Sequence, residues 1–296
     1  MKKIKKLFPV ILALALMITT LVSTASASAD DTEWRFDEAT STLYVYGNGA
    51  MSDYADEFSA PWHSFVADIK NVVIESGVTA VGAYAFCGAS SLTSVSIADT
   101  VTSIGAFAFD SCSMLKALAL SSNVISIADS SFASVGASPK EDFVLRVNNG
   151  SYAFHYAVVN EIPFDVDAVG CGIYPVQIKP KAMYAYYKFV PSLDGEYAFN
   201  SIGVHSVKGA VYDESFNTLY SSRTSFSTTL SMTAGKTYYV GVSLVSTVLA
   251  GSFQLSIQPT YDINLDGYVN AKDYAAMKQA DSKYLSTFKN FITTIK

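Results

Sequence analysis

Near the C-terminal end of the chain, twelve residues place oxygen-bearing side chains at alternate positions. Residues 262–273 read D-I-N-L-D-G-Y-V-N-A-K-D, with a glycine at the sixth position. A calcium loop needs oxygen ligands at positions 1, 3, 5, 7, 9 and 12, and a glycine at position 6 for a sharp turn. The predicted ligands are Asp262, Asn264, Asp266, the backbone carbonyl of Tyr268, Asn270 and Asp273. The alternative interpretation is an Asx-rich turn at a domain edge.

The chemistry of this loop favours Ca²⁺ (calcium) over Mg²⁺. Three carboxylates balance the charge of the ion, whereas Mg²⁺ gives up its water reluctantly and resists a cage made of many protein ligands. The residues that follow, 274–278, read as the start of a helix. The sequence therefore predicts a small α segment that carries one calcium loop.

Two features separate this loop from an ordinary EF-hand: position 12 is Asp, and Asn follows the apolar residue at position 8. In both features residues 262–279 resemble one segment of a type I dockerin, the calcium module that attaches proteins to cohesin-bearing scaffolds. The resemblance implies a cohesin-facing surface at Ala271, Lys272, Lys278 and Gln279. A full dockerin has two such segments, and residues 281–296 contain no second one. Weak cohesin binding, another partner and a calcium-stabilised cap all stay open.

The first residues indicate export. Four lysines precede an apolar run from Leu7 to Val22, and small residues at 25–29 fit a small-x-small cleavage site. This is the arrangement of a secretory signal peptide, predicted over residues 1–29. The alternative is a retained membrane anchor, although the apolar run falls just short of a bilayer span. After cleavage we expect no transmembrane segment and a secreted, extracellular protein, associated with the cell surface through a scaffold.

Composition narrows the class of partner. Loss of the four leader lysines lowers the formal charge from −6 to −10, which disfavours nucleic acid because binding to phosphates depends on Lys and Arg. Removing 29 of 296 residues leaves 267, more than one compact core usually holds, so two or three modules are expected. The three cysteines, Cys87, Cys112 and Cys171, are an odd number, and no disulfide framework is expected.

A repeat of 23 residues is the clearest internal signal. Six apolar columns coincide over three copies: Ile69, Leu92 and Leu115; Val72, Val95 and Leu118; Ile74, Ile97 and Leu120; Val78, Val101 and Val124; Val81, Ile104 and Ile127; and Phe86, Phe109 and Phe132. Each copy predicts a short strand with one buried face, a turn at Gly82 or Gly105, and an aromatic residue inside the coil. One coil cannot bury its own apolar face, so stacked coils are expected to form a solenoid with a parallel sheet.

The pattern V-T-S-I-G-A-F-A-F-x-x-C-x-x-L at residues 101–115 resembles the BspA-type leucine-rich repeat of bacterial surface proteins. The resemblance covers residues 30–165. It implies a capping hairpin around 34–51, with Trp62 closing the first coil, and a closing segment at 150–164. A sugar-stacking role for Trp62 with His63 is the alternative. The third copy has Ala128 and Ser131 where the others have Gly and Ala, as befits a terminal coil.

Between residues 166 and 259 the period disappears and short strands separated by turn residues follow one another, which predicts a β-sandwich. The expected strands lie at 184–189, 195–199, 209–212, 228–232, 237–242 and 252–257. Residues 187–197 resemble the PPC-like jelly-roll modules of secreted bacterial proteins; an unrelated sandwich is the alternative. The predicted fold is mainly β, with four parts: leader 1–29, repeats 30–165, jelly-roll sandwich 166–259 and calcium segment 260–296.

No catalytic set is evident in the sequence. His63, His155 and His205 fall in three different segments, and no H-E-x-x-H, G-x-S-x-G or phosphate-loop motif occurs. A pair of remote carboxylates stays open as a glycosidase alternative. Cys87 and Cys112 lie beside the interior aromatics and are expected to be small buried hydrophobes.

These features together predict a secreted, non-catalytic binding protein. The repeats are expected to recognise a host or plant surface protein or polysaccharide, while the calcium segment tethers the chain to a cohesin-bearing scaffold protein of a cellulosome-type complex for polysaccharide breakdown. The first alternative is a cell-surface adhesin in which calcium is only structural. The second is a carbohydrate-binding accessory module.

Overall fold

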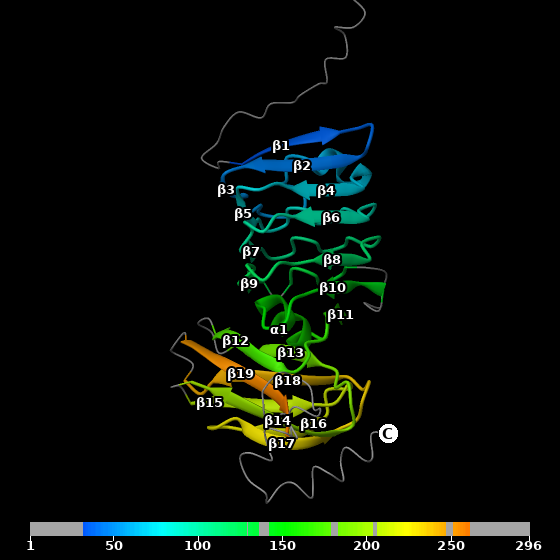
Figure 1. Ribbon diagram of the computed structural model, residues 1–296. Helices are drawn as coiled ribbons and strands as arrows, with labels where there is room; N and C mark the ends of the chain where they lie inside the picture. The colour runs from blue at the N-terminus through cyan, green and yellow to red at the C-terminus, as the bar shows by residue number, and fades with distance from the viewer. Residues whose placement is uncertain are drawn as a thin grey trace, which may run out of the picture.

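The computed structural model describes residues 32–128, 130–135, 142–178, 183–203, 206–246 and 251–260. In this part of the chain the fold is mainly β, as predicted, and consists of a stack of coils followed by a pair of sheets (Figure 1). The predicted leader, the calcium loop and the cohesin-facing positions lie outside the described residues. No helix among the described residues is long and apolar enough to cross a membrane.

The N-terminal cap is a hairpin, as predicted. Strands β1 (Thr32–Asp37) and β2 (Thr42–Gly47) pair antiparallel, and β2 then pairs parallel with the first repeat strand. Trp62 closes the first coil: it is buried, its Nε1 donates to the carbonyl of Ala85 at 2.7 Å, and its ring stacks on Phe86. These contacts confirm the capping role, because the ring has no free face for a sugar.

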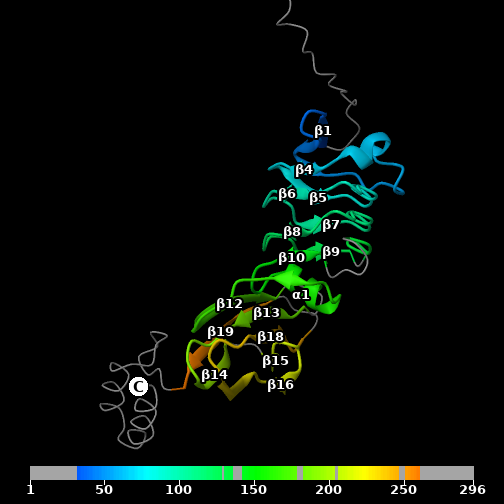
Figure 2. The ribbon, with the colours of Figure 1, turned by 90° about the vertical axis from the view of Figure 1, so that its right-hand side faces the viewer.

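The repeats form a solenoid with parallel strands on two sides (Figure 2). One side carries β4 (Asn71–Ile74), β6 (Ser94–Ile97), β8 (Ala117–Ala119), β10 (Val144–Arg146) and β11 (Phe164–Asp165). We call the outer surface of this sheet the strand face. The other side carries β3 (Gly49–Ala50), β5 (Val78–Val81), β7 (Ser103–Ile104) and β9 (Ser126–Ile127). A 3₁₀ segment, η1 (His63–Asp68), leads into the first coil.

The predicted columns fill the interior of the solenoid. All their members are buried except Val95 and Ile97, which are partly buried against the same core. The aromatic column forms a ladder through the coils, with ring centroids 5.4 to 5.8 Å apart: Trp62, Phe86, Phe109, Phe132 and Phe143. Each rung covers the apolar face that its neighbour cannot bury alone.

The repeat glycines begin a turn, as predicted: the carbonyls of Gly82 and Gly105 accept from the backbone N–H of Ala85 and Ala108, both at 3.4 Å. The need for glycine at these positions comes from close packing, which was not predicted. Neither Gly82 nor Gly105 has a positive φ. A Cβ on Gly82 would lie 1.8 Å from the carbonyl oxygen of Ser52, and one on Gly105 would lie 2.5 Å from the nitrogen of Ala83. The backbones of adjacent coils approach so closely here that only glycine fits.

Helix α1 (Tyr152–Val159) closes the C-terminal end of the solenoid. Its N-cap is Ser151, whose hydroxyl accepts from the backbone N–H of Phe154 at 3.1 Å. The hydrophobic core of the repeats continues beyond this helix, because Phe154 packs against Tyr186 and Tyr239 of the next module. The repeats and the outer face of one sandwich sheet therefore share one hydrophobic core.

In the described residues, that next module has eight strands in two four-stranded antiparallel sheets. The strands are β12 (Gly172–Ile178), β13 (Ala185–Phe189), β14 (Gly195–Ile202), β15 (Val207–Tyr212), β16 (Thr218–Ser222), β17 (Ser227–Met232), β18 (Tyr238–Leu244) and β19 (Gly251–Pro259). One sheet has the order β12-β19-β14-β17 and the other β13-β18-β15-β16. A second hydrophobic core lies between the sheets, with Phe189, Phe199 and Leu255 among its fully enclosed members.

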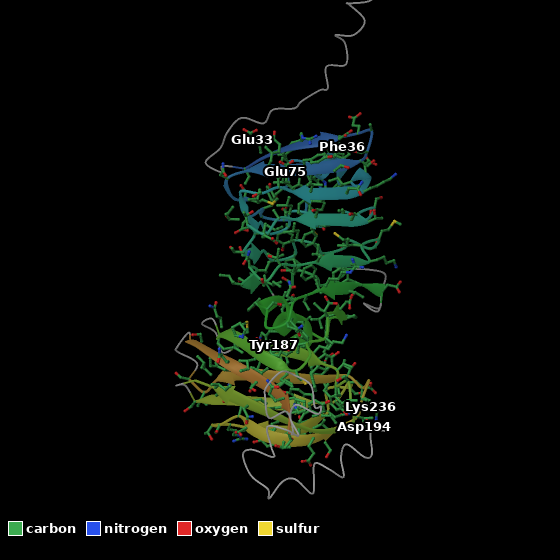
Figure 3. All side chains as sticks on the ribbon, viewed as in Figure 1. Glu33, Phe36, Glu75, Tyr187, Asp194 and Lys236 are labelled. Carbon is green, nitrogen blue, oxygen red and sulfur yellow. The ribbon has the colours of Figure 1, made fainter. Side chains whose placement is uncertain are left out.

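Six of these strands were predicted and two were missed. β12 carries Pro175 in its middle, a residue that argues against a central strand; the strand lies at a sheet edge, where proline is tolerated. β16 is polar and mostly exposed, also at an edge, and so lacks the apolar alternation of a strand with one buried face. Asp194 and Lys236 lie close together at one side of the sandwich, at the lower right of Figure 3.

Candidate binding site on the strand face

The strand face is hollowed where β6, β8, β10 and β11 end. Two adjoining hollows, of about 410 and about 210 Å³, share Ala119, Leu120 and Asn148 in their walls. Together they form a groove, here called the strand-face groove, lined by Ile97, Asp99, Ala119–Asn123, Arg146–Asn148 and Asp165–Asp167.

Small side chains produce this groove. On β8 the outward residues are Ala117 and Ala119, whereas the neighbouring strand β10 places Val144 and Arg146 beside them. A methyl group rises far less above the sheet than a guanidinium side chain, so the surface dips along β8. Of these two alanines, Ala119 lies in the wall of both hollows.

The groove walls are fixed by asparagine side chains. Asn123 Nδ2 donates to the carbonyl of Asp99 at 2.9 Å, and Asn148 Nδ2 donates to that of Leu120 at 3.3 Å. Asn149 Nδ2 donates to the carbonyl of Asp167 at 2.7 Å. Each bond ties the loop of one coil to another segment, and a surface held in this way loses little conformational entropy when it binds a partner.

The charge of the groove is negative. Its exposed ionisable groups are the carboxylates of Asp99, Asp165 and Asp167 and the guanidinium of Arg146. Arg146 lies beside Asp165 on the next parallel strand. Near the N-terminal cap the same face carries Glu33 and Glu75 (Figure 3) together with Arg35, whose guanidinium lies over the ring of Tyr44. The face suits a partner that brings basic or hydrogen-bonding groups.

The other chemically interesting residues do not form a second site. His63 begins η1 at the N-terminal end of the stack, His155 lies in α1 at the other end, and His205 lies outside the described residues. None of the three cysteines forms a disulfide bond. In the described ranges no group of three or more His, Cys, Asp or Glu side chains is arranged to hold a metal ion.

Cys87 and Cys112 are buried beside the aromatic ladder, as predicted. The Sγ of Cys87 lies 3.9 Å from carboxylate oxygens of both Glu57 and Asp110. Burial, and then the charges of Asp110 and Glu57, raise the pKa of the Cys87 thiol to about 11. Burial raises the pKa of Cys112 further still. Both thiols stay protonated at neutral pH, which makes them poor nucleophiles.

Sequence reasoning did not identify the groove residues, although it placed their strands. The lining residues belong to loops whose Ser, Asn and Asp content is typical of any turn, so their composition carries no distinct signal. The small outward residue Ala119 of β8 was the one available sign.

Comparison with known proteins supports the repeat part of this description. The family model "BspA type Leucine rich repeat region" matches residues 63–168 in six copies. No curated protein matches the chain. Among solved structures, a leucine-rich repeat protein from Eubacterium ventriosum is similar at 23% identity and a TM-score of 0.27. That match covers 48% of this chain and 30% of the other, so the chain spans less than a third of that protein.

Two further structures are similar over separate parts. A leucine-rich repeat protein from T. pallidum is 13% identical, with 49% of this chain and 85% of the other covered and a TM-score of 0.28. The pre-peptidase C-terminal domain of a collagenase from Bacillus anthracis is 13% identical, with 32% of this chain and 97% of the other covered and a TM-score of 0.28. The match of the family model together with the coil geometry identifies residues 63–168 as a BspA-type leucine-rich repeat region.

Proposed function

We propose that the chain is a secreted, non-catalytic binding protein and that the strand-face groove is its recognition site. The observation that carries this proposal is the groove itself: an open, polar hollow with walls fixed by side-chain hydrogen bonds. Leucine-rich repeats point to protein or surface recognition. Their specificity resides in exposed strand-face residues of this kind.

The partner we propose is a surface protein that presents an extended basic segment. Three carboxylates against one guanidinium give the groove a negative field, and a lysine or arginine side chain would meet Asp99 or Asp165 without displacing any hydrogen bond of the walls. A polysaccharide partner, which carries hydroxyls but no positive charge, would instead depend on Asn123 and Asn148 and on the neighbouring Ser121 and Ser122.

The remaining parts would connect this recognition site to a larger complex. If the strands of the sandwich are counted from β12 as the first to β19 as the eighth, one sheet has the order 1-8-3-6 and the other has the order 2-7-4-5. We infer from this order that the sandwich is a jelly roll of PPC-like type. The predicted calcium loop at residues 262–273 would tether the chain to a cohesin-bearing scaffold outside the cell.

The test is binding of the mature chain, residues 30–296, to arrayed extracellular proteins, lysine-rich peptides and cellulose, xylan and pectin. The groove variant is Asp99→Lys with Asp165→Lys, and the control is Glu38→Lys, an exposed acid in the turn of the cap hairpin. We expect the groove variant to lose at least about tenfold in affinity for any protein or peptide ligand, while the control binds as the wild type. Equal binding by all three proteins would remove the groove as the site.

A second arm separates recognition from tethering. Retention on immobilised cohesins is measured in calcium and in chelator. Loss of retention in chelator, with peptide binding unchanged, supports a calcium tether beside an independent recognition site. Retention that ignores calcium, or that never occurs, refutes the tether and leaves the adhesin alternative.

A further inference from the structure

The outer face of sheet β12-β19-β14-β17 is the one broad surface of the sandwich that the repeats do not cover. Because Phe253, Leu255 and Ile257 of β19 point into the core, the alternate residues of that strand point outward. The outward residues of the whole sheet include a single charged one, Glu196 of β14; the others are Ile173, Pro175, Gln177, Ala198, Asn200, Ile202, Ser227, Thr229, Ser231, Ser252, Gln254, Ser256 and Gln258. A free surface of an acidic, secreted protein would carry more charge.

Part of this outer face is buried. Along β19, Ser252 and Gln254 are exposed, but Ser256 is 6% exposed and Gln258 is 8% exposed. The register places Ala198 opposite Gln258 on β14, and Cys171, the residue before Gly172 of β12, on its other side. Both side chains are short and cover little of a glutamine side chain that points away from the core.

Gln258 is also unsatisfied. Its Oε1 is buried and accepts no hydrogen bond. A buried amide oxygen without a donor costs about 1 to 3 kcal/mol, so this atom marks a place where a donor from a packed segment belongs. Exposed Ile173, opposite Ser256 on the neighbouring strand, adds apolar area for that segment.

The course of the chain after β19 indicates which segment covers this face. β19 ends at Pro259, and thirty-six residues, 261–296, follow directly from the buried end of the face. Their last part places Tyr284, Phe288, Phe291 and Ile292 at spacings of three and four, which gives a helix one apolar side. A segment tethered this closely has a far higher effective concentration at the face than any separate partner.

We propose that residues 261–296 dock on the outer face of sheet β12-β19-β14-β17, over Ala198, Ser256 and Gln258. The sandwich then joins two attachments: one sheet shares a core with the repeats, and the other carries the C-terminal segment. Any tether formed by that segment holds the strand-face groove at a fixed orientation rather than on a flexible linker. This inference stands apart from the groove and does not require calcium in the loop.

The test compares two isosteric substitutions on one strand of the full chain. Gln258→Glu places a carboxylate in the buried part of the face, and Gln254→Glu places the same group in the exposed part. A carboxylate resists burial, so at pH 7 we expect amide exchange in peptides from 261–296 to rise at least about tenfold in Gln258→Glu and to stay unchanged in Gln254→Glu. At pH 4, where the carboxyl is largely protonated, wild-type protection should return after correction for the intrinsic rate.

Peptides from β18 report whether the sandwich itself stays folded. If the β18 peptides also lose protection in Gln258→Glu, a second pair of variants, Ala198→Arg and Ile202→Arg, is compared by amide exchange in the 261–296 peptides. Exchange should rise in Ala198→Arg and stay unchanged in the control Ile202→Arg, because Ile202 is exposed. The proposal is overturned if the 261–296 peptides exchange equally in the wild type and in the buried-site variant. Binding at the groove is not measured in this experiment, so either proposal can fail without the other.

Discussion

Replacement of Phe109 by alanine removes the middle rung of the aromatic ladder. The ring is fully buried and stacks on Phe86 at 5.4 Å and on Phe132 at 5.7 Å, so its loss leaves a cavity between coils. A buried Phe→Ala change costs about 3 to 5 kcal/mol. With a urea m-value of about 2 kcal/mol/M, a loss of about 4 kcal/mol lowers the unfolding midpoint by about 2 M.

The measurement is urea unfolding followed by tryptophan fluorescence. Both tryptophans, Trp34 and Trp62, lie in the N-terminal cap, so the signal reports on the repeat end of the molecule. Phe109→Leu keeps most of the apolar volume and is expected to cost about 1 to 2 kcal/mol, mainly through lost ring stacking and shape. The matched control is Phe58→Ala, because Phe58 is 64% exposed and its loss should change stability by no more than about 0.5 kcal/mol.

The order of the urea midpoints of the three variants shows whether the aromatic ladder holds the coils together. If Phe109→Ala and Phe58→Ala lower the midpoint equally, the ladder does not hold the coils together and the cap alone determines the signal. A change in m-value rather than midpoint would mean that the coils unfold separately instead of as one unit.

Three further predictions follow from single residues. Gly105→Ala should lower the melting temperature of the repeats by several degrees, because its Cβ would lie 2.5 Å from the backbone nitrogen of Ala83; unchanged melting would contradict the close approach. Burial lowers the pKa of His155 below its unfolded value of about 6.5, so the unfolded state binds more protons and stability falls as the pH drops through and below 6.5. His155→Gln should therefore flatten the dependence of the urea midpoint on pH between 7.5 and 5. Cys87, with a thiol pKa of about 11, should resist a disulfide reagent at pH 8 in the folded chain and react once urea unfolds it.

In the repeat region, the period of the sequence alone is enough to predict which residues face the interior. Each coil returns to the same place, so a column such as Phe86, Phe109 and Phe132 must face the interior if any of its members does, and all three are buried. The glycines lie at the predicted turns, but the close packing that requires glycine there was not predicted. Sequence shows that Gly82 recurs, whereas only coordinates show that the space beside it holds the backbone of Ser52.

The sandwich shows the opposite case. β13 and β18 are apolar on both faces, with Tyr186 and Tyr187 adjacent and both buried, and such a run predicts a strand covered on both sides. Which module covers the second side depends on long-range packing that no local pattern records. Tyr187 faces the sandwich core near Gly150 of the repeats, and Tyr186 faces α1 (Figure 3).

The join between the modules also reaches the strand-face groove. Asp165 and Asp167, which line its C-terminal end, belong to β11 and to the connection that enters the sandwich. Lys188 of β13 fixes this connection: its Nζ donates to the carbonyl of Val166 at 3.1 Å, and its backbone N–H donates to Oδ1 of Asn149 at 2.8 Å. Asn149 in turn holds Asp167 through its Nδ2. One wall of the groove is therefore positioned by the sandwich, so a force or ligand that shifts the sandwich against the repeats must also change the shape of the groove.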